Sequence, residues 1–208
     1  MKLRHFIAAS VATLAAASAM AAPIVTPVYT TTGIDMLGEI NASEYTLDMS
    51  FQLDDLSGWR KVVDFSDRTS DAGVYLYWDQ LGFATDSDAF YVSSTAGSSV
   101  GTRVTLTRDS SGLFSAYVNG ALQFSFNDSA NNAVFTTTGG QTSAWLLADD
   151  ATTGFAEQSA GTISSIKVYD HALSAREIAA VPEPESVALV GAGLLTLISL
   201  GRRRQNKA

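Results

Sequence analysis

Cysteine is absent from the 208 residues, and only two histidines are present. The absence of cysteine excludes disulfide bonds, cysteine nucleophiles and thiolate metal sites, so the domain must be stable through its core alone. One of the histidines, His5, lies just before the first apolar segment, which leaves His171 as the only histidine of the remaining chain. A single histidine cannot build a multi-histidine zinc site, and we expect His171 to lie at the surface, at the entry to a helix.

The first 21 residues have the three parts of a secretory signal peptide. Lys2 and Arg4 form a basic start, residues 6–17 are apolar, and Ala19-Met20-Ala21 is a small-x-small cleavage site. We therefore expect an exported protein whose mature chain begins at residue 22. The alternative is an uncleaved anchor helix.

Three short segments follow one another at the C-terminus: the polar motif Val181-Pro182-Glu183-Pro184-Glu185, the apolar run 187–200 and the cations Arg202, Arg203 and Arg204. With its flanking residues the apolar run would form a helix about 24 Å long, somewhat shorter than a hydrocarbon core of about 30 Å. It can still span if the arginines snorkel and the bilayer thins locally. The arginines would stay cytoplasmic, which places the preceding chain outside.

This C-terminal order resembles the PEP-CTERM sorting signal of Gram-negative bacteria, in which a Val-Pro-Glu-Pro motif precedes a hydrophobic segment and a basic cluster. The resemblance implies an exosortase as a partner, which removes the tail 182–208 after its transient insertion in the membrane. The protein would then reach the cell envelope or the extracellular matrix of a biofilm. The alternative is a permanent transmembrane anchor.

Few cations remain between the two targeting segments. Residues 22–181 contain 19 acidic and 7 basic residues, a net charge of −12, and have the length of one ordinary domain. Such an acidic domain is a poor partner for nucleic acid or anionic lipid, and it is compatible with divalent cations or neutral glycans.

Alternation of apolar and polar residues predicts an all-β domain. Residues 45–53 alternate over nine positions, as in a strand with one buried face. The Asn119-Gly120 pair between two apolar runs predicts a two-residue type I′ hairpin. Residues 136–142 are expected to form a loop. Further strands are expected at 62–65, 73–78, 90–93, 103–108, 113–118, 121–126, 144–148 and 162–169, which favours a β-sandwich or jelly roll.

One short helix is predicted at 175–180. Ser174 and Glu177 form a capping box, and Leu173 and Ile178 form a hydrophobic staple around the helix start. We expect the apolar side of this helix to pack on the end of the sandwich.

Several segments resemble the laminin-G-like, concanavalin A-like jelly roll, namely 104–112, 116–120, 161–170 and 172–178. The resemblance implies that residues 22–181 form two antiparallel sheets of six or seven strands with a curved concave face, closed by the last strand and the small helix. The signal peptide and the C-terminal apolar run would add one helix each outside this domain.

Two groups of residues are candidates for a binding site. Asp149, Asp150 and Glu157 lie on one predicted loop, and clustered oxygen ligands of this kind suit Ca²⁺, which laminin-G-like domains often hold at a loop rim. The alternative is a set of solvated turn carboxylates. Tyr75 and Tyr77 share one face of a predicted strand, with Val74, Leu76 and Trp78 on the other, so the tyrosine face either stacks on sugars or packs in the core or at an edge.

A catalytic site is not expected. Glycoside hydrolysis needs two carboxyl groups that face one cleft. Some glucanases with this jelly roll carry a Glu-x-Asp-x-x-Glu arrangement, but Asn41 stands between Glu39 and Glu44 here. We therefore expect an exported, non-catalytic protein that binds glycans or other matrix material. The alternatives are a structural or adhesive matrix protein without a small ligand and, third, a glycoside hydrolase.

Overall fold

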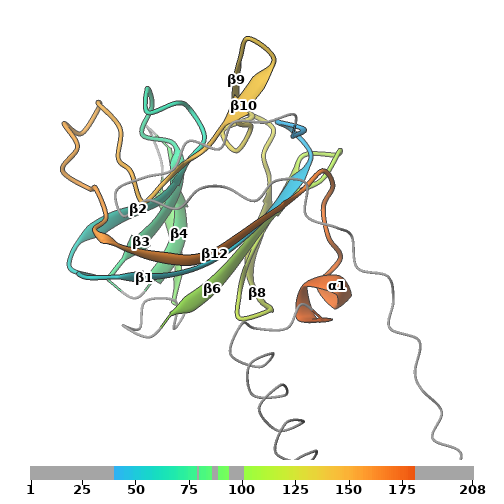
Figure 1. Ribbon diagram of the computed structural model, residues 1–208, viewed down its shortest axis with the longest axis horizontal. Helices are drawn as coiled ribbons and strands as arrows, with labels where there is room; N and C mark the ends of the chain where they lie inside the picture. The colour runs from blue at the N-terminus through green and yellow to red at the C-terminus, as the bar shows by residue number, and fades with distance from the viewer. Residues whose placement is uncertain (1–39, 79, 86–88, 94–100, 181–208) are drawn as a thin grey trace, which may run out of the picture.

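The computed structural model describes residues 40–78, 80–85, 89–93 and 101–180 (Figure 1). The predicted signal peptide, the sorting motif from residue 181, the apolar run 187–200 and the three arginines lie outside these residues. Within the described part of the chain, no helix is long and apolar enough to cross a membrane.

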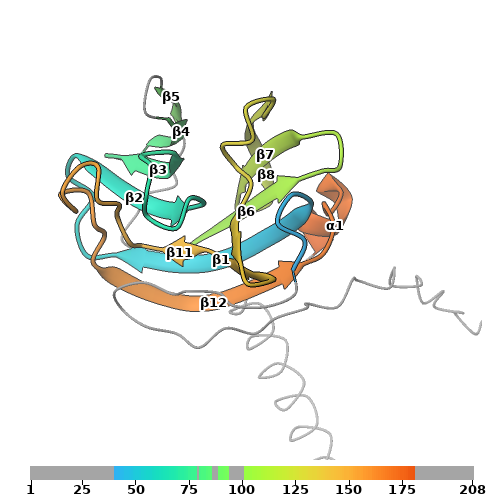
Figure 2. The same cartoon turned by 90° about the horizontal axis from the view of Figure 1, so that it is seen from above.

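Two five-stranded antiparallel sheets face each other (Figure 2). We call the sheet with the order β12-β1-β6-β7-β8 the first sheet; its strands are β1 Tyr45–Leu53, β6 Thr102–Arg108, β7 Leu113–Val118, β8 Ala121–Asn127 and β12 Gly161–Tyr169. The second sheet has the order β11-β2-β3-β4-β5; its strands are β2 Trp59–Asp64, β3 Gly73–Tyr77, β4 Gln80–Ala84, β5 Ala89–Ser93 and β11 Trp145–Leu146. The predicted all-β, two-sheet jelly-roll architecture is therefore confirmed, but in the described residues each sheet has five strands rather than the expected six or seven.

Two parts of the strand prediction were wrong. Residues 136–142, expected to be a loop, form the hairpin of β9 Thr136–Thr138 and β10 Gln141–Ser143. Gly139 and Gly140 both have positive φ at its turn, where they avoid the steric cost of a side chain. Strand β4 was missed because Gly82 interrupts its short apolar pattern; Gly82 pairs with Tyr75 on β3.

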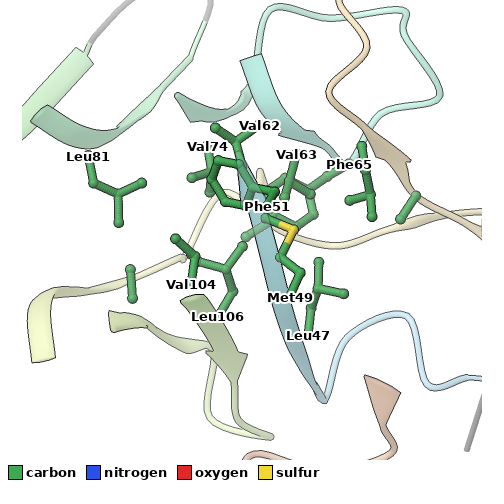
Figure 3. Close-up of a cluster of buried hydrophobic side chains, with 14 of the residues drawn as sticks. Leu47, Met49, Phe51, Val62, Val63, Phe65, Val74, Leu81, Val104 and Leu106 are labelled. Atoms are coloured by element: carbon green, nitrogen blue, oxygen red, sulfur yellow. The ribbon is translucent and has the colours of Figure 1, made fainter. Parts of the chain in front are cut away.

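The core lies between the two sheets (Figure 3). Alternate residues of β1, which are Leu47, Met49 and Phe51, point inward, and Leu106 and Val104 of β6 lie opposite the first two of them. From the second sheet, Val63, Val74 and Leu81 enter the same cluster, together with Phe65, which follows β2 directly. Packed aromatic rings fill one part of it, with Phe83 and Phe114 centred 5.4 Å apart and Phe65 and Phe135 centred 5.0 Å apart. This large buried surface stabilises the domain without disulfides.

Two local predictions from sequence are confirmed. Asn119 and Gly120 have φ of 49° and 80°, the positive values that a type I′ turn requires. Helix α1 is Ala175–Ala180. Its capping box is formed, because the backbone amide of Glu177 donates to Ser174 Oγ at 3.3 Å and the amide of Ser174 donates to the Glu177 carboxylate at 2.9 Å.

Helix α1 packs on the outer face of the first sheet rather than over the end of the sandwich. Leu173 and Ile178 join Tyr117 of β7 and Tyr169 of β12 in a second apolar cluster. Both tyrosines lie on the side of the sheet that points away from the core. The chain enters the helix over Thr46, whose hydroxyl donates to the carbonyl oxygen of His171 and accepts from the amide of Leu173, both at 2.8 Å. His171 thus lies at the helix entry, as predicted.

Candidate functional site

The outer face of the second sheet carries a fully buried lysine. On β2, Trp59, Lys61 and Asp64 lie opposite Tyr77, Tyr75 and Gly73 of β3. An irregularity in the register between Lys61 and Val63 lets Val62 and Val63 both join the core, while Lys61 points outward. Gly73 leaves the space that this side chain needs. A Cβ atom at Gly73 would lie 2.9 Å from Cε of Lys61 and 2.6 Å from the carbonyl oxygen of Val63.

The ammonium group of Lys61 is surrounded by oxygen atoms. Its Nζ lies 2.5 Å from Oδ2 of Asp150, 2.9 Å from Oδ2 of Asp64 and 3.2 Å from the carbonyl oxygen of Ser70. It also lies 5.3 Å from the centre of the Tyr75 ring. Burial opposes the charge on Lys61, but the hydrogen bond with Asp150 and the charge of Asp64 outweigh it, so the pKa of Lys61 is raised.

Two aspartates, Asp149 and Asp150, lie on the loop between β11 and β12, and Asp150 contacts Lys61. Asp150 Oδ1 accepts from the amide of Thr152 at 2.6 Å. Asp149 Oδ2 accepts from the hydroxyl of Thr153 and from the amide of Glu157, both at 2.8 Å. The other oxygen of Asp149, Oδ1, is buried without a hydrogen-bond partner. Both aspartates therefore fix the path of the loop through its backbone amides.

Glu157 and Asp71 complete an acidic group around Lys61. Burial, followed by the charges of Asp71, Asp149 and Asp150, raises the pKa of Glu157 to about 7. Burial also raises the pKa of Asp71, although the hydroxyl of Tyr75 donates to its Oδ1 at 2.7 Å. One cation thus faces more carboxylates than it can neutralise, and the excess negative charge lies on this face of the domain.

The structure brings Asp149, Asp150 and Glu157 to one loop, as the calcium prediction requires. Among the described residues, however, no group of three or more acidic, histidine or cysteine side chains is arranged to hold a metal ion. Lys61 Nζ already lies between the carboxylates of Asp64 and Asp150. Calcium therefore stays a prediction, and of the three residues the unpaired oxygen of Asp149 and the half-buried Glu157 are the ones not held by Lys61.

Aromatic residues gather beside this group, at the end of the sheet where β2 begins. The ring of Trp59 is centred 4.9 Å from that of Tyr77 and 5.8 Å from that of Tyr75. Tyr75 and Tyr77 share the face that points away from the core, but Tyr75 is fully buried and cannot contact a ligand directly. Tyr77 and Trp59 are half-buried.

Trp78 was expected in the strand, on the same face as Val74 and Leu76, but β3 ends at Tyr77. Trp78 has a φ of 57°, outside the strand, and its side chain is 56% exposed. Its amide donates to the carbonyl oxygen of Gly58 at 3.1 Å, which ties this turn to the start of β2. We call Trp59, Tyr77 and Trp78 the aromatic surface.

Sequence reasoning missed three residues of this region, which are Lys61, Arg68 and Asp71. The guanidinium carbon of Arg68 lies 5.1 Å from the ring centre of Trp145 and 4.8 Å from that of Phe155, and its Nε donates to the carbonyl oxygen of Asp149 at 2.7 Å. A signal for Lys61 was present in the sequence, because a lysine in the middle of an apolar strand needs a buried counter-charge.

A family model described as the concanavalin A-like lectin/glucanases superfamily matches residues 29–179. The chain belongs to this superfamily. A second model, the PEP-CTERM protein-sorting motif, matches residues 180–205, so both resemblances seen in the sequence are confirmed. A comparison with curated proteins finds no match.

Solved structures with a similar fold include a carbohydrate-binding module and two whole enzymes. The CBM40 module of the Ruminococcus gnavus IT-sialidase has a TM-score of 0.55 at 16% identity, with 76% of this chain and 97% of that chain covered. The K499G mutant of the NanB sialidase from Streptococcus pneumoniae has a TM-score of 0.54 at 17% identity, with 76% and 28% covered. The leech intramolecular trans-sialidase has a TM-score of 0.53 at 17% identity, again with 76% and 28% covered. This chain thus spans about a quarter of the length of the two whole enzymes, and at these identities the likeness concerns the fold alone.

Proposed function

We propose that this protein is an exported, non-catalytic glycan-binding protein that the sorting motif directs to the cell envelope or the biofilm matrix. The observation that carries the proposal is the aromatic surface, in which the exposed Trp78 lies next in sequence to Tyr77, whose ring packs on Trp59. Indole and phenol rings offer flat apolar faces with a polar edge, which suit the alternating apolar and hydroxyl-bearing faces of a sugar ring.

The surroundings of the aromatic surface support a preformed site. Trp59 and Tyr77 are directly opposite each other on β2 and β3, and the backbone bond from Trp78 to Gly58 fixes the neighbouring turn. Rings held in this way lose little conformational freedom on binding, which favours affinity. The similar R. gnavus module has been solved with α2,3- and α2,6-sialyllactose, so the fold is compatible with glycan binding.

The carboxylates of this face are engaged in ways that a hydrolase would not need. Asp150 neutralises Lys61 and, like Asp149, accepts from backbone amides of its loop. Glu157 is the exception, because a pKa of about 7 suits a general acid. The hydrolase alternative therefore depends on Glu157 and on a second carboxyl across a cleft from it.

The C-terminal motif supplies the second half of the proposal. The matched motif begins at residue 180, which is also the last residue of α1. An exosortase would act on this motif while the apolar run 187–200 holds the chain in the membrane. In this proposal the tail decides where the domain is delivered, and the aromatic surface decides what it holds there.

A polysaccharide pull-down with the purified full chain in mild detergent tests the proposal. We expect binding to at least one polysaccharide, and a loss of at least about tenfold in affinity for Trp78→Ala, since stacked aromatic residues dominate such sites. Leu122→Ala is the matched control, because Leu122 is an equally exposed apolar residue (55%) on β8 of the other sheet. Absence of binding to any polysaccharide would support the structural-protein alternative. Release of reducing ends that Glu157→Gln abolishes would support the hydrolase alternative.

A further inference from the structure

We infer that the aromatic surface takes neutral, hydroxyl-rich polysaccharides and rejects glycans that carry carboxylates, such as sialylated or uronic-acid chains. This inference rests on the proposed glycan-binding function and narrows its ligand class. It depends on which charges near the aromatic surface are available to a ligand and which are already committed to partners within the domain.

The cations near this surface are committed to internal partners. Arg60, next to Trp59 in the chain, pairs with Asp55 and donates to the carbonyl oxygen of Trp59 at 2.8 Å. Lys61 is fully buried between Asp64 and Asp150. Recognition of a sugar carboxylate requires a cation whose donors can reach it, ideally the two parallel donors of an arginine.

The third nearby cation is also occupied. The guanidinium of Arg68 lies between the rings of Trp145 and Phe155, and its Nε is bonded to the backbone of Asp149. To bind a ligand carboxylate, Arg68 would have to leave the bond that helps to fix the loop between β11 and β12. Within the described residues, this side of the second sheet therefore offers no free cation that is already placed for an anionic sugar.

The carboxylates on the same side are in excess. Asp149 accepts from the amide of Glu157 at 2.8 Å, Asp150 lies 2.5 Å from Lys61 Nζ, and Asp71 accepts from the hydroxyl of Tyr75, whose ring lies beside the same lysine. Burial first, and then the charges of these three aspartates, raise the pKa of Glu157. Above neutral pH this group carries more negative charge than Lys61 and Arg68 together can offset. An approaching carboxylate meets like charge, which suppresses binding of that partner, whereas a neutral sugar is unaffected. Sugar hydroxyls can in addition donate hydrogen bonds to carboxylate oxygens.

The similar R. gnavus module takes a ligand of the kind that we expect this chain to reject. That module is solved with sialyllactose, an anionic glycan, on a related fold. At 16% identity the fold does not carry the ligand with it, and the side chains on this chain's second sheet set the opposite charge preference.

A matched pair of ligands tests the inference with the full chain in mild detergent. The probes are a neutral glucan that binds in the pull-down and its carboxymethylated derivative, together with lactose and 3′-sialyllactose. We expect the charged member of each pair to bind at least about tenfold more weakly at low salt. The difference should shrink at about 1 M salt, where the Debye length falls to about 3 Å.

Two variants locate the source of the discrimination. Glu157→Gln combined with Asp71→Asn removes two negative charges from this face and keeps an acceptor for the Tyr75 hydroxyl, so the difference between neutral and charged probes should fall severalfold. Asp170→Asn is the matched control, because Asp170 is exposed beside His171, after β12 of the first sheet. It should leave the difference unchanged.

The possible outcomes separate this inference from the proposed function. If no glycan of either charge binds, the glycan-binding function itself fails. If the charged probes bind as tightly as the neutral ones or more tightly, glycan binding stands and the inference is overturned. The inference is also overturned if the double variant and Asp170→Asn show the same difference in affinity between neutral and charged probes. The carboxylates of this face would then not be the source of that difference.

Discussion

The outer faces of the two sheets both bury a cation, but they balance its charge differently. On the first sheet, Arg103 Nε donates to Asp48 Oδ1 at 2.8 Å, the hydroxyl of Thr105 donates to the same oxygen, and Arg103 also donates to the carbonyl oxygen of Ile178 in α1. On the second sheet, Lys61 faces two buried carboxylates, with further carboxylates nearby. The pair of Arg103 and Asp48, with one charge of each sign, holds α1 against the first sheet. The group around Lys61, in which carboxylates are in excess, holds the loop between β11 and β12 and also leaves negative charge on this face.

Replacement of Lys61 is expected to have the largest effect. Lys61→Met keeps much of the side-chain volume but leaves Asp64 and Asp150 buried without their cation, so we expect a loss of about 5 kcal/mol in the free energy of unfolding. Urea denaturation followed by tryptophan fluorescence measures it. Arg60→Met is the control, since the partner carboxylate of Arg60, that of Asp55, is exposed to solvent, and loss of this pair should move the midpoint far less. Equal effects of the two variants would contradict the central role of Lys61.

Replacement of Arg103 is expected to have a smaller effect, because only one carboxylate loses its partner and Asp48 keeps the hydroxyl of Thr105. We expect Arg103→Met to lower the free energy of unfolding by about 3 kcal/mol. It should also loosen α1, because the carbonyl oxygen of Ile178 loses its hydrogen bond from Arg103. Hydrogen exchange of the helix amides, measured beside urea denaturation, checks both parts. A larger loss than that of Lys61→Met would reverse the comparison between the two faces.

The pH dependence of stability should come from the second face. The folded pKa of Glu157, about 7, lies above its ordinary value of 4.5, and Asp71, Asp149, Asp150 and Lys61 are the charged groups that act on it. The folded state therefore binds this proton more tightly than the unfolded state. Its contribution to stability is complete below pH 4.5 and is lost as the pH rises through 7.

When the pH is lowered from 8 to 5.5, we expect the free energy of unfolding to rise by about 1 kcal/mol, after allowing for solvent screening of a half-buried group. Chemical denaturation at a series of pH values measures it, and Glu157→Gln should flatten the profile. The carboxyls whose pKa values are lowered, such as that of Asp55 at about 2, titrate below this window. Stability that rises from pH 5.5 to pH 8 would contradict the assignment to Glu157.

Calcium is expected to have the smallest effect of all. An occupied site at 100 times its dissociation constant would add about 2.7 kcal/mol. Because Lys61 already neutralises Asp150, we expect thermal melts in Ca²⁺ and in EDTA to coincide within error. A clear rise of the midpoint in Ca²⁺, abolished by Asp149→Asn, would instead establish the calcium site predicted from the sequence.

Most of the fold could be predicted from the sequence, because in most elements the local sequence pattern and the tertiary packing favour the same structure. The alternation in β1 gave its bounds, Asn119-Gly120 gave a turn, and Ser174 with Glu177 gave the start of α1. Strand β4 and the β9–β10 hairpin were missed, because Gly82 and the threonine-glycine stretch have no clear apolar periodicity. In both places pairing with a neighbouring strand, rather than local pattern, decides the structure.

The site was predicted less well, because its geometry depends on contacts between distant residues. Lys61 and Asp150 are 89 positions apart, and no local motif joins them. The alternation rule placed Tyr75 and Tyr77 on one face correctly, but it did not show that Tyr75 is buried beneath Trp59 and Asp71. It also placed Trp78 in the strand, whereas the positive φ of this residue ends the strand before it.

The pairing of β1 with β12 has a consequence for the timing of export. β1 has two partners, and one of them, β12, lies far along the chain: Thr46 is opposite Tyr169, 123 residues later. A chain that crosses a membrane from its N-terminus cannot close its first sheet until nearly the whole domain has emerged. By then only residues 170–186 separate β12 from the apolar run. In the proposed export route the last step of folding and the arrest of the tail in the bilayer therefore fall close together, and we expect the sorting enzyme to meet a domain that has only just closed.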